Sequence, residues 1–191
     1  MPLFPGIFAS SISGHLTPVV VDDGSYFPLG EFTLASAQST VEFTNIPQTY
    51  THLQVRMIGR LTNTGSNVTT GKITVNSTTS TNMAYHRITG DGATVSAYAY
   101  SSYSGWEDLL IVPQDGTTAD TYSAAVLDIL DYANTNKNKT MRLLSAADVN
   151  GSGRIIFGSG LVNSTTAISS ITFSTTSLFK QHSHFALYGV L

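Results

Sequence analysis

The chain of 191 residues contains no cysteine and few charges. The absence of thiols excludes disulfide bonds, thiolate zinc sites and cysteine nucleophiles. Charged residues make up 11% of the sequence, less than half of the usual share of about 25%. The net charge is −3 and the Lys and Arg residues are scattered, whereas nucleic-acid binding needs a basic stripe. We therefore expect no nucleic-acid partner.

Long apolar runs are also missing. No segment approaches the roughly 18 apolar residues of a membrane span. The first residues, MPLFPGIFASSISGHL, lack the positive n-region of a signal peptide, and Pro2 and Pro5 interrupt any apolar helix there. We expect synthesis in the cytoplasm, no cleaved export signal and no membrane insertion.

Short runs rich in Val, Ile, Phe and Thr fill the chain, and Gly, Asn, Asp and Ser separate them. In residues 51–58, Leu53, Val55 and Met57 alternate with His52, Gln54 and Arg56, which is typical of a strand with one buried face. Strands are also predicted over 72–76, 109–112, 123–132 and 140–146, with a polar loop over 62–70. About ten or eleven such strands predict an all-β fold, an antiparallel β-sandwich with jelly-roll-like connections.

The N-terminal segment differs from the rest. Residues 1–24 are small and apolar, contain prolines, and end at an Asp-Asp-Gly sequence. We predict that they form an extended docking arm, followed by a β-sandwich domain over residues 25–191. The apolar residues expected to anchor the arm on a partner are Phe4, Ile7, Phe8, Ile12 and Leu16.

Several longer segments carry a resemblance to a known family. They are FPGIFASSISGHL, FTNIPQTYTHLQVR, AYHRITGDG, AAVLDILDYANTNKNKTMRLLSA and the terminal FALYGVL. Together they make the chain resemble small tailed-phage virion proteins of the minor tail or tail-fibre type over nearly its full length. The resemblance implies a structural component of a phage particle and brings no catalytic motif. The stretches 98–108 and 61–71 are peculiar to this chain, and individual specificity is expected in them.

One aromatic run is the best ligand candidate. Aromatic faces stack on sugar rings, and neighbouring carboxylates orient the sugar hydroxyls. The alternative is that the same rings pack in the core or at a subunit interface, where Tyr and Trp are enriched. The candidate glycan contacts are Tyr98, Tyr100, Tyr103, Trp106 and Asp108.

Other clusters are weaker candidates. Asp128, Asp131, Asn134, Asn136 and Asn138 offer hard oxygen ligands for calcium, but their spacing favours an Asx-type turn that closes a hairpin. His182 and His184 share strand parity and form a second candidate metal pair, with no acidic residue nearby in sequence. We predict no bound metal and no cofactor.

Catalytic patterns are equally weak. The serine-rich segments lack the nucleophile-elbow frame. Glu107 and Asp108 beside Trp106 are the carboxylate arrangement closest to a glycosidase pair. We therefore predict no catalytic residues and a protein that is not an enzyme.

The expected function is that of a virion structural protein, a minor tail or fibre component that aids adsorption to a host-surface glycan. Its expected location is the virion, assembled in the host cytoplasm, and its expected partners are other virion proteins and two further copies in a homotrimer. The first alternative is a head decoration protein that binds capsomers through the arm. The second is a glycan-degrading enzyme.

Overall fold

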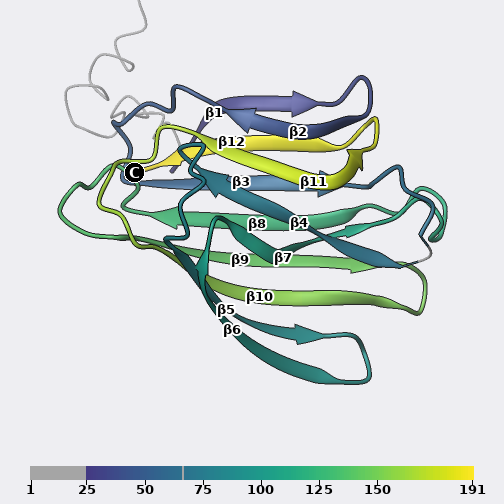
Figure 1. Ribbon diagram of the computed structural model, residues 1–191. Coiled ribbons are helices and arrows are strands. Elements are labelled where there is room, and N and C mark those ends of the chain that lie inside the picture. The colour runs from purple at the N-terminus through teal and green to yellow at the C-terminus, as the bar shows by residue number, and fades with distance from the viewer. Residues whose placement is uncertain (1–24, 66) are drawn as a thin grey trace, which may run out of the picture.

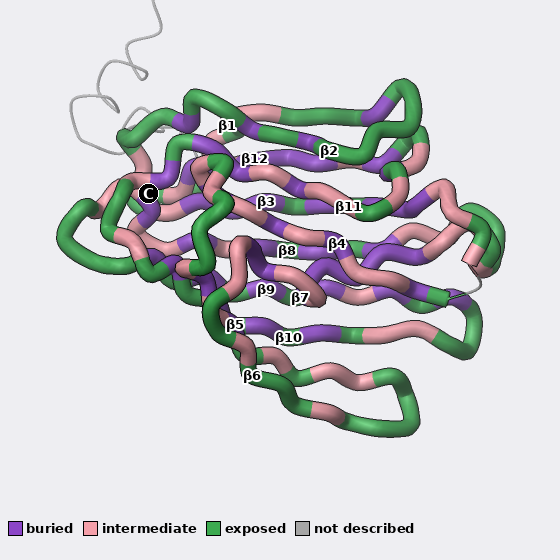
Figure 2. Tube along the Cα trace, viewed as in Figure 1, coloured by how far each residue is buried: buried purple, intermediate pink, exposed green. Residues whose placement is uncertain are grey.

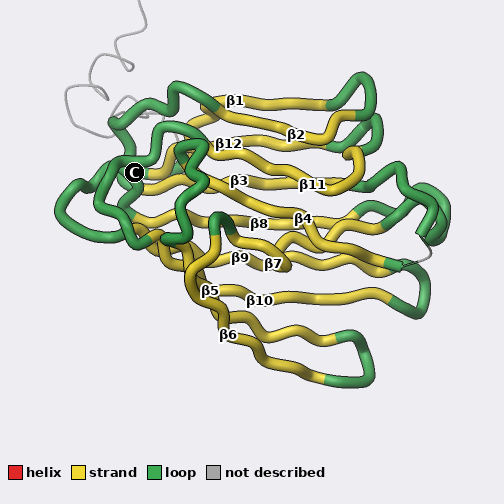
Figure 3. Tube along the Cα trace, in the orientation of Figure 1, coloured by secondary structure: helices red, strands yellow, loops and turns green. Residues whose placement is uncertain are grey.

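The computed structural model describes residues 25–65 and 67–191, and within them every regular element is a strand (Figure 3). The predicted arm, with Phe4, Ile7, Phe8, Ile12 and Leu16, lies outside the described residues. No helix in the described part of the chain has the length and apolarity to cross a membrane. The strands are β1 Tyr26–Thr33, β2 Gln38–Phe43, β3 His52–Gly59, β4 Val68–Val75, β5 Met83–Gly90, β6 Val95–Tyr103, β7 Trp106–Pro113, β8 Ser123–Leu130, β9 Lys139–Asp148, β10 Gly153–Val162, β11 Ile171–Phe179 and β12 His184–Val190.

The strands form two antiparallel sheets of unequal width (Figure 1). The wide sheet has the order β1-β12-β3-β8-β9-β10-β5-β6, and the narrow sheet has the order β2-β11-β4-β7. The predicted antiparallel β-sandwich is confirmed, while this strand order does not confirm jelly-roll connectivity. The predicted hairpin between 123–132 and 140–146 is present as β8 and β9, with Leu127 opposite Leu143.

Alternation places the core between the sheets. In β3, Leu53, Val55 and Met57 are buried and Arg56 is exposed, as the sequence predicts. Gln54 is also buried although it lies on the other face, because it donates a hydrogen bond to Asp128 Oδ1 at 2.8 Å. The same alternation of buried and exposed positions runs along β8, β9 and β10 (Figure 2).

β4 and β7 begin earlier than the sequence suggests. β4 starts at Val68, inside the predicted polar loop, and β7 starts at Trp106 instead of Leu109. In both cases tertiary pairing extends a strand into polar or small residues, because β4 and β7 pair with each other from Val68 opposite Pro113 to Ile73 opposite Trp106.

Glycines on β10 bring the narrow sheet close to the wide one. Gly158 and Gly160 face inward, and a Cβ at these positions would lie 2.9 Å from Leu109 Cδ2 and 2.6 Å from Trp106 Nε1. β7 therefore packs directly on β10. The next two strands, β5 and β6, extend past the narrow sheet, and much of this hairpin is half-buried or exposed (Figure 2).

A methyl group at Gly160 should disturb this contact. We expect Gly160→Ala to lower the free energy of unfolding by about 1–3 kcal/mol, because Trp106 has to move to admit the new Cβ. Gly90→Ala is the matched control, since its Cβ would meet Ile155 at an ordinary 3.4 Å; its change should stay below about 0.5 kcal/mol. Urea denaturation measures both, and equal stability of the two variants would contradict the close β7–β10 contact.

Candidate functional site at the open edge of the sandwich

The aromatic run lies on the inner face of the β5–β6 hairpin. Tyr98 and Tyr100 share this face, as predicted, with ring centroids 6.3 Å apart. Arg87 on β5 is opposite Tyr98, and its guanidinium carbon lies 4.7 Å from the Tyr98 ring centroid and 5.7 Å from that of Tyr100. Tyr98 remains 44% exposed, so part of its ring is available at this edge.

The deeper aromatic residues serve packing. Tyr100 stacks on the buried Tyr85 at 4.8 Å, and Tyr103 meets both rings edge-on. Trp106 is fully buried. The expectation that Trp106 contacts a ligand is therefore wrong: Gly160 on β10 provides the space that admits the indole to the core. In the sequence, Trp106 follows Gly and Ser residues that suggest an exposed loop. Gly160, which leaves room for the indole, lies on a strand far away in the chain, so the sequence around residue 106 does not show that Trp106 is buried.

Asp108 occupies a bulge in β7. The register between β4 and β7 shifts between Gly71 and Ile73, and Asp108 has a φ of 58°. In a bulge of this kind the side chain no longer follows the alternation between the two faces of the strand and points in a new direction. The Asp108 carboxylate consequently accepts a 2.8 Å hydrogen bond from Thr70 Oγ1 and remains partly exposed.

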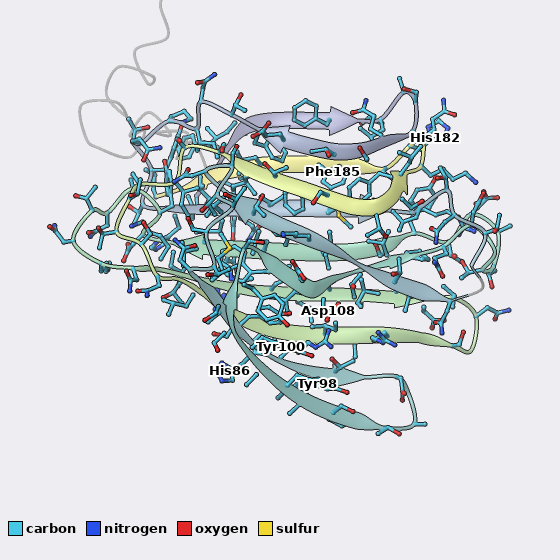
Figure 4. The ribbon with its side chains drawn as sticks, viewed as in Figure 1. His86, Tyr98, Tyr100, Asp108, His182 and Phe185 are labelled. Carbon is cyan, nitrogen blue, oxygen red and sulfur yellow. The ribbon has the colours of Figure 1, made fainter. Side chains whose placement is uncertain are left out.

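Arg87 connects the two sheets at this point. Its Nη2 lies 3.8 Å from Asp108 Oδ2, and its Nη1 donates to the backbone carbonyl of Asp108. The guanidinium therefore has the Tyr98 ring on one side and the Asp108 carboxylate on another. Figure 4 labels Tyr98, Tyr100 and Asp108 at this edge of the sandwich. Arg87 is not among the residues predicted from the sequence. The signal that could have found it is strand parity, which places residue 87 on the same face of the hairpin as Tyr98.

A polar groove runs from Asp108 over the narrow sheet. It has a volume of about 370 Å³. Within it Lys72 pairs with Glu107 at 3.0 Å and donates to Ser104 Oγ at 2.8 Å. Its lining residues are Thr70, Gly71, Lys72, Glu107, Asp108, Ser174, Thr175 and Thr176. Carboxylates, hydroxyls and one ammonium group thus lie together in this groove, and Arg87 connects its Asp108 to the Tyr98 ring.

Four buried polar atoms on β5 and β7 are unpaired within the described residues. These are the Tyr85 hydroxyl, Arg87 Nε, Thr89 Oγ1 and Trp106 Nε1. Burial raises the pKa of Tyr85 well above its ordinary value, and the nearby Asp108 carboxylate raises it further. Tyr85 therefore stays a neutral phenol at physiological pH and is unsuited to act as a base.

The oxygen-rich cluster around β8 and β9 holds protein cations. Asp128 pairs with Arg142 at 2.9 Å, and Asp131 pairs with Lys137, which lowers the pKa of that carboxyl. The buried Lys139 ammonium donates to the carbonyls of Asn134, Lys137 and Thr165. Asn134 Oδ1 accepts from the backbone of Asn136, as an Asx turn does, and Asn138 donates to Asn163.

This arrangement leaves no grouped metal ligands. In residues 25–65 and 67–191, no three His, Asp or Glu side chains gather closely enough to hold an ion. The two C-terminal histidines do not share a strand face: His182 lies in a turn with a φ of 72°, while His184 on β12 is 3.0 Å from Thr33 Oγ1.

Comparisons with known proteins add little to this geometry. No protein-family model and no curated protein matches the chain. Among solved structures, the crystal structure of the marine PL-14 alginate lyase from Aplysia kurodai is similar over 96% of this chain and 94% of that chain, at 10% identity and a TM-score of 0.33. A likeness at this level supports no inference about function.

The buried Lys139 should be essential to the β8–β9 connection. We expect Lys139→Met to lower the free energy of unfolding by about 2–4 kcal/mol, because three carbonyls lose a charged donor inside the protein. Lys137→Met is the matched control, since Lys137 is half-exposed and loses an ion pair in contact with solvent. Denaturant titration compares them, and an equally large loss in the control would contradict the role of the buried ammonium.

Proposed function

We propose that this chain is a structural protein of a tailed-phage virion, a minor tail or fibre component that binds a host-surface glycan at the groove beside Asp108. The observation that carries the glycan site is the joining of an exposed aromatic ring, Tyr98, to the carboxylate of Asp108 through Arg87. The placement in a virion is supported by the sequence segments that resemble phage tail proteins.

The groove has the chemistry that a neutral or weakly charged sugar needs. Asp108 and Glu107 accept hydrogen bonds from sugar hydroxyls, Lys72 donates them, and the hydroxyls of Thr70 and Thr175 can do either. Hydrogen bonds to charged groups contribute about 1.5–3 kcal/mol each, more than neutral ones. Tyr98 supplies an apolar face for the ring carbons of the same sugar.

Arg87 orders the two halves of this site. Its side chain is 10% exposed, so it acts on Asp108 from below and leaves the outer lone pairs of the carboxylate free for a ligand. Because the Thr70 hydroxyl already fixes Oδ1, the carboxylate is held in place before a ligand arrives, which reduces the ordering cost of binding.

In a tail or fibre, such a site would act many times at once. A single shallow groove gives weak binding, and linking several copies raises the overall affinity without new contacts. The arm of residues 1–24 would anchor each copy to other virion proteins. The same arm would serve a head decoration protein, so the position on the particle separates the two functions.

Two substitutions test the glycan site. We expect Tyr98→Ala and Asp108→Asn each to weaken binding to isolated host cell envelopes and to a bacterial polysaccharide array by at least about tenfold, since each removes about 1.4 kcal/mol or more. Tyr26→Ala is the control for the first, because Tyr26 is also 44% exposed but lies on the opposite edge strand. Asp120→Asn is the control for the second, because Asp120 is exposed and also has a φ of 58°.

Unchanged binding in the two site variants would overturn the glycan site. Release of new sugar ends from the array polysaccharides by the wild-type protein would show an enzyme instead of a binding protein.

The placement is tested by immunogold electron microscopy of intact particles with an antibody against residues 25–191. Label at the tail is the expected result. Label spread over the head would overturn the tail assignment and favour a decoration protein that binds capsomers.

A further inference from the structure

The outer face of the wide sheet is apolar across most of its strands. Cross-strand register places Val126, Leu144, Phe157 and Ile88 in one row. The next row contains Ile58, Ala124, Ala146, Ile155 and Val95. Leu161 extends the surface along β10, and the larger members of the set are between 38% and 76% exposed. We call this set the outer apolar face.

This face is larger than a monomer usually leaves in water. Eight large side chains, Ile58, Ile88, Val95, Val126, Leu144, Ile155, Phe157 and Leu161, are exposed by about half on average. At about 150–200 Å² for a fully exposed large side chain, they present about 600–800 Å². Monomers rarely exceed about 300–600 Å² in one apolar patch, whereas each partner in a stable protein interface buries about 800 Å².

The outer apolar face contains a shallow apolar hollow, so it is not flat. It has a volume of about 460 Å³ and lies between β10, β5 and β6. Phe157, Ile88, Ala97 and Ala99 contribute to its lining, and the small alanines on the edge strand form one wall. Such a hollow accepts protruding side chains from a partner of similar apolar character.

The charges bordering the face are self-complementary. Asp128 on β8 and Arg142 on β9 lie side by side in the next row, with Arg142 Nε 2.9 Å from Asp128 Oδ2. A two-fold axis parallel to the strands, between β8 and β9, exchanges these two positions. It therefore places Asp128 of one copy over Arg142 of the other and alternates the signs of all four charges.

The same axis matches the apolar rows. Because Val126 is paired with Leu144 in register, the rotation places Val126 of one copy on Leu144 of the second copy. In the next row it places Ile58 on Ile155, since β3 and β10 flank β8 and β9 symmetrically. Arg56 on β3 continues the first row beside Val126, and the rotation places it over Phe157 of the other copy, a cation over an aromatic ring. The polar row meets its own complement at Asp128 and Arg142.

We propose that the outer apolar face binds a second copy of this chain, in a two-fold, sheet-to-sheet dimer. This assignment goes beyond the glycan-binding proposal. Asp108 and its groove lie on the narrow sheet, whereas Tyr98 and Arg87 also line the hollow of the outer apolar face. The dimer rests on the exposed apolar rows and on the Asp128–Arg142 pair, none of which belongs to the glycan site. The two-fold dimer differs from the homotrimer expected from the sequence.

The test is the mass of the full chain in solution, by light scattering during size-exclusion chromatography over a range of concentrations. The wild type should elute at twice its 20.4 kDa monomer mass. Leu144→Glu should elute as a monomer at the same concentrations, because it places two carboxylates in the apolar contact with Val126 of the other copy. Leu178→Glu, on the narrow sheet and 41% exposed, should remain a dimer.

Charge exchange gives a second check of the geometry, in variants that keep native circular dichroism and the wild-type midpoint of urea denaturation, because Asp128 and Arg142 also pair within one copy. Asp128→Arg and Arg142→Asp should each weaken the dimer at least about tenfold, and the double exchange should restore it. A monomeric wild type, a trimeric mass, or a dimer that persists in Leu144→Glu with native circular dichroism would overturn the proposal.

Discussion

The unequal width of the two sheets is the constraint on which the rest of this structure depends. Four strands cannot cover eight, and the narrow sheet ends at β7, over β10. The β5–β6 hairpin therefore has an inner face that is covered only in part, at Met83 and Tyr85, and Arg87 spans the gap to the Asp108 bulge. Burial of apolar side chains stabilises the middle of the sandwich. At its edge, the two sheets are joined by the Arg87 guanidinium, which contacts the rings of Tyr98 and Tyr100 and the Asp108 carboxylate.

Buried cations play a second structural role in the loops. Lys139 satisfies three carbonyls at one end of the sandwich, and the buried Arg60 donates to Asp115 and to the carbonyls of Thr117, Thr118 and Thr121. Loop carbonyls that turn inward need a donor, and a long cationic side chain supplies several at once. A segment rich in oxygen-bearing residues can suggest a metal site, yet its oxygen atoms can instead bind a lysine or arginine side chain of the same protein.

The parts of the candidate site that sequence could predict were those governed by local periodicity. Alternation correctly placed Tyr98 and Tyr100 on one strand face, and it did the same for Leu53, Val55 and Met57. Trp106 was misplaced and Arg87 was missed, because their surroundings come from strands far away in the chain. The Asp108 bulge depends on pairing with β4, which no local pattern near residue 108 reveals.

The sequence by itself determined an all-β, antiparallel sandwich without disulfides, because short β-branched runs and turn residues leave few other ways to bury the apolar faces. The choice of sheet for each strand was decided only by tertiary structure. That choice buried Trp106 over Gly160, exposed Tyr98, and left Phe157 and Leu144 on an uncovered face. The physical reason is that the alternation of side chains along a strand determines which residues share one face of the sheet. Whether that face packs against the other sheet or contacts solvent depends on how the two sheets are assembled.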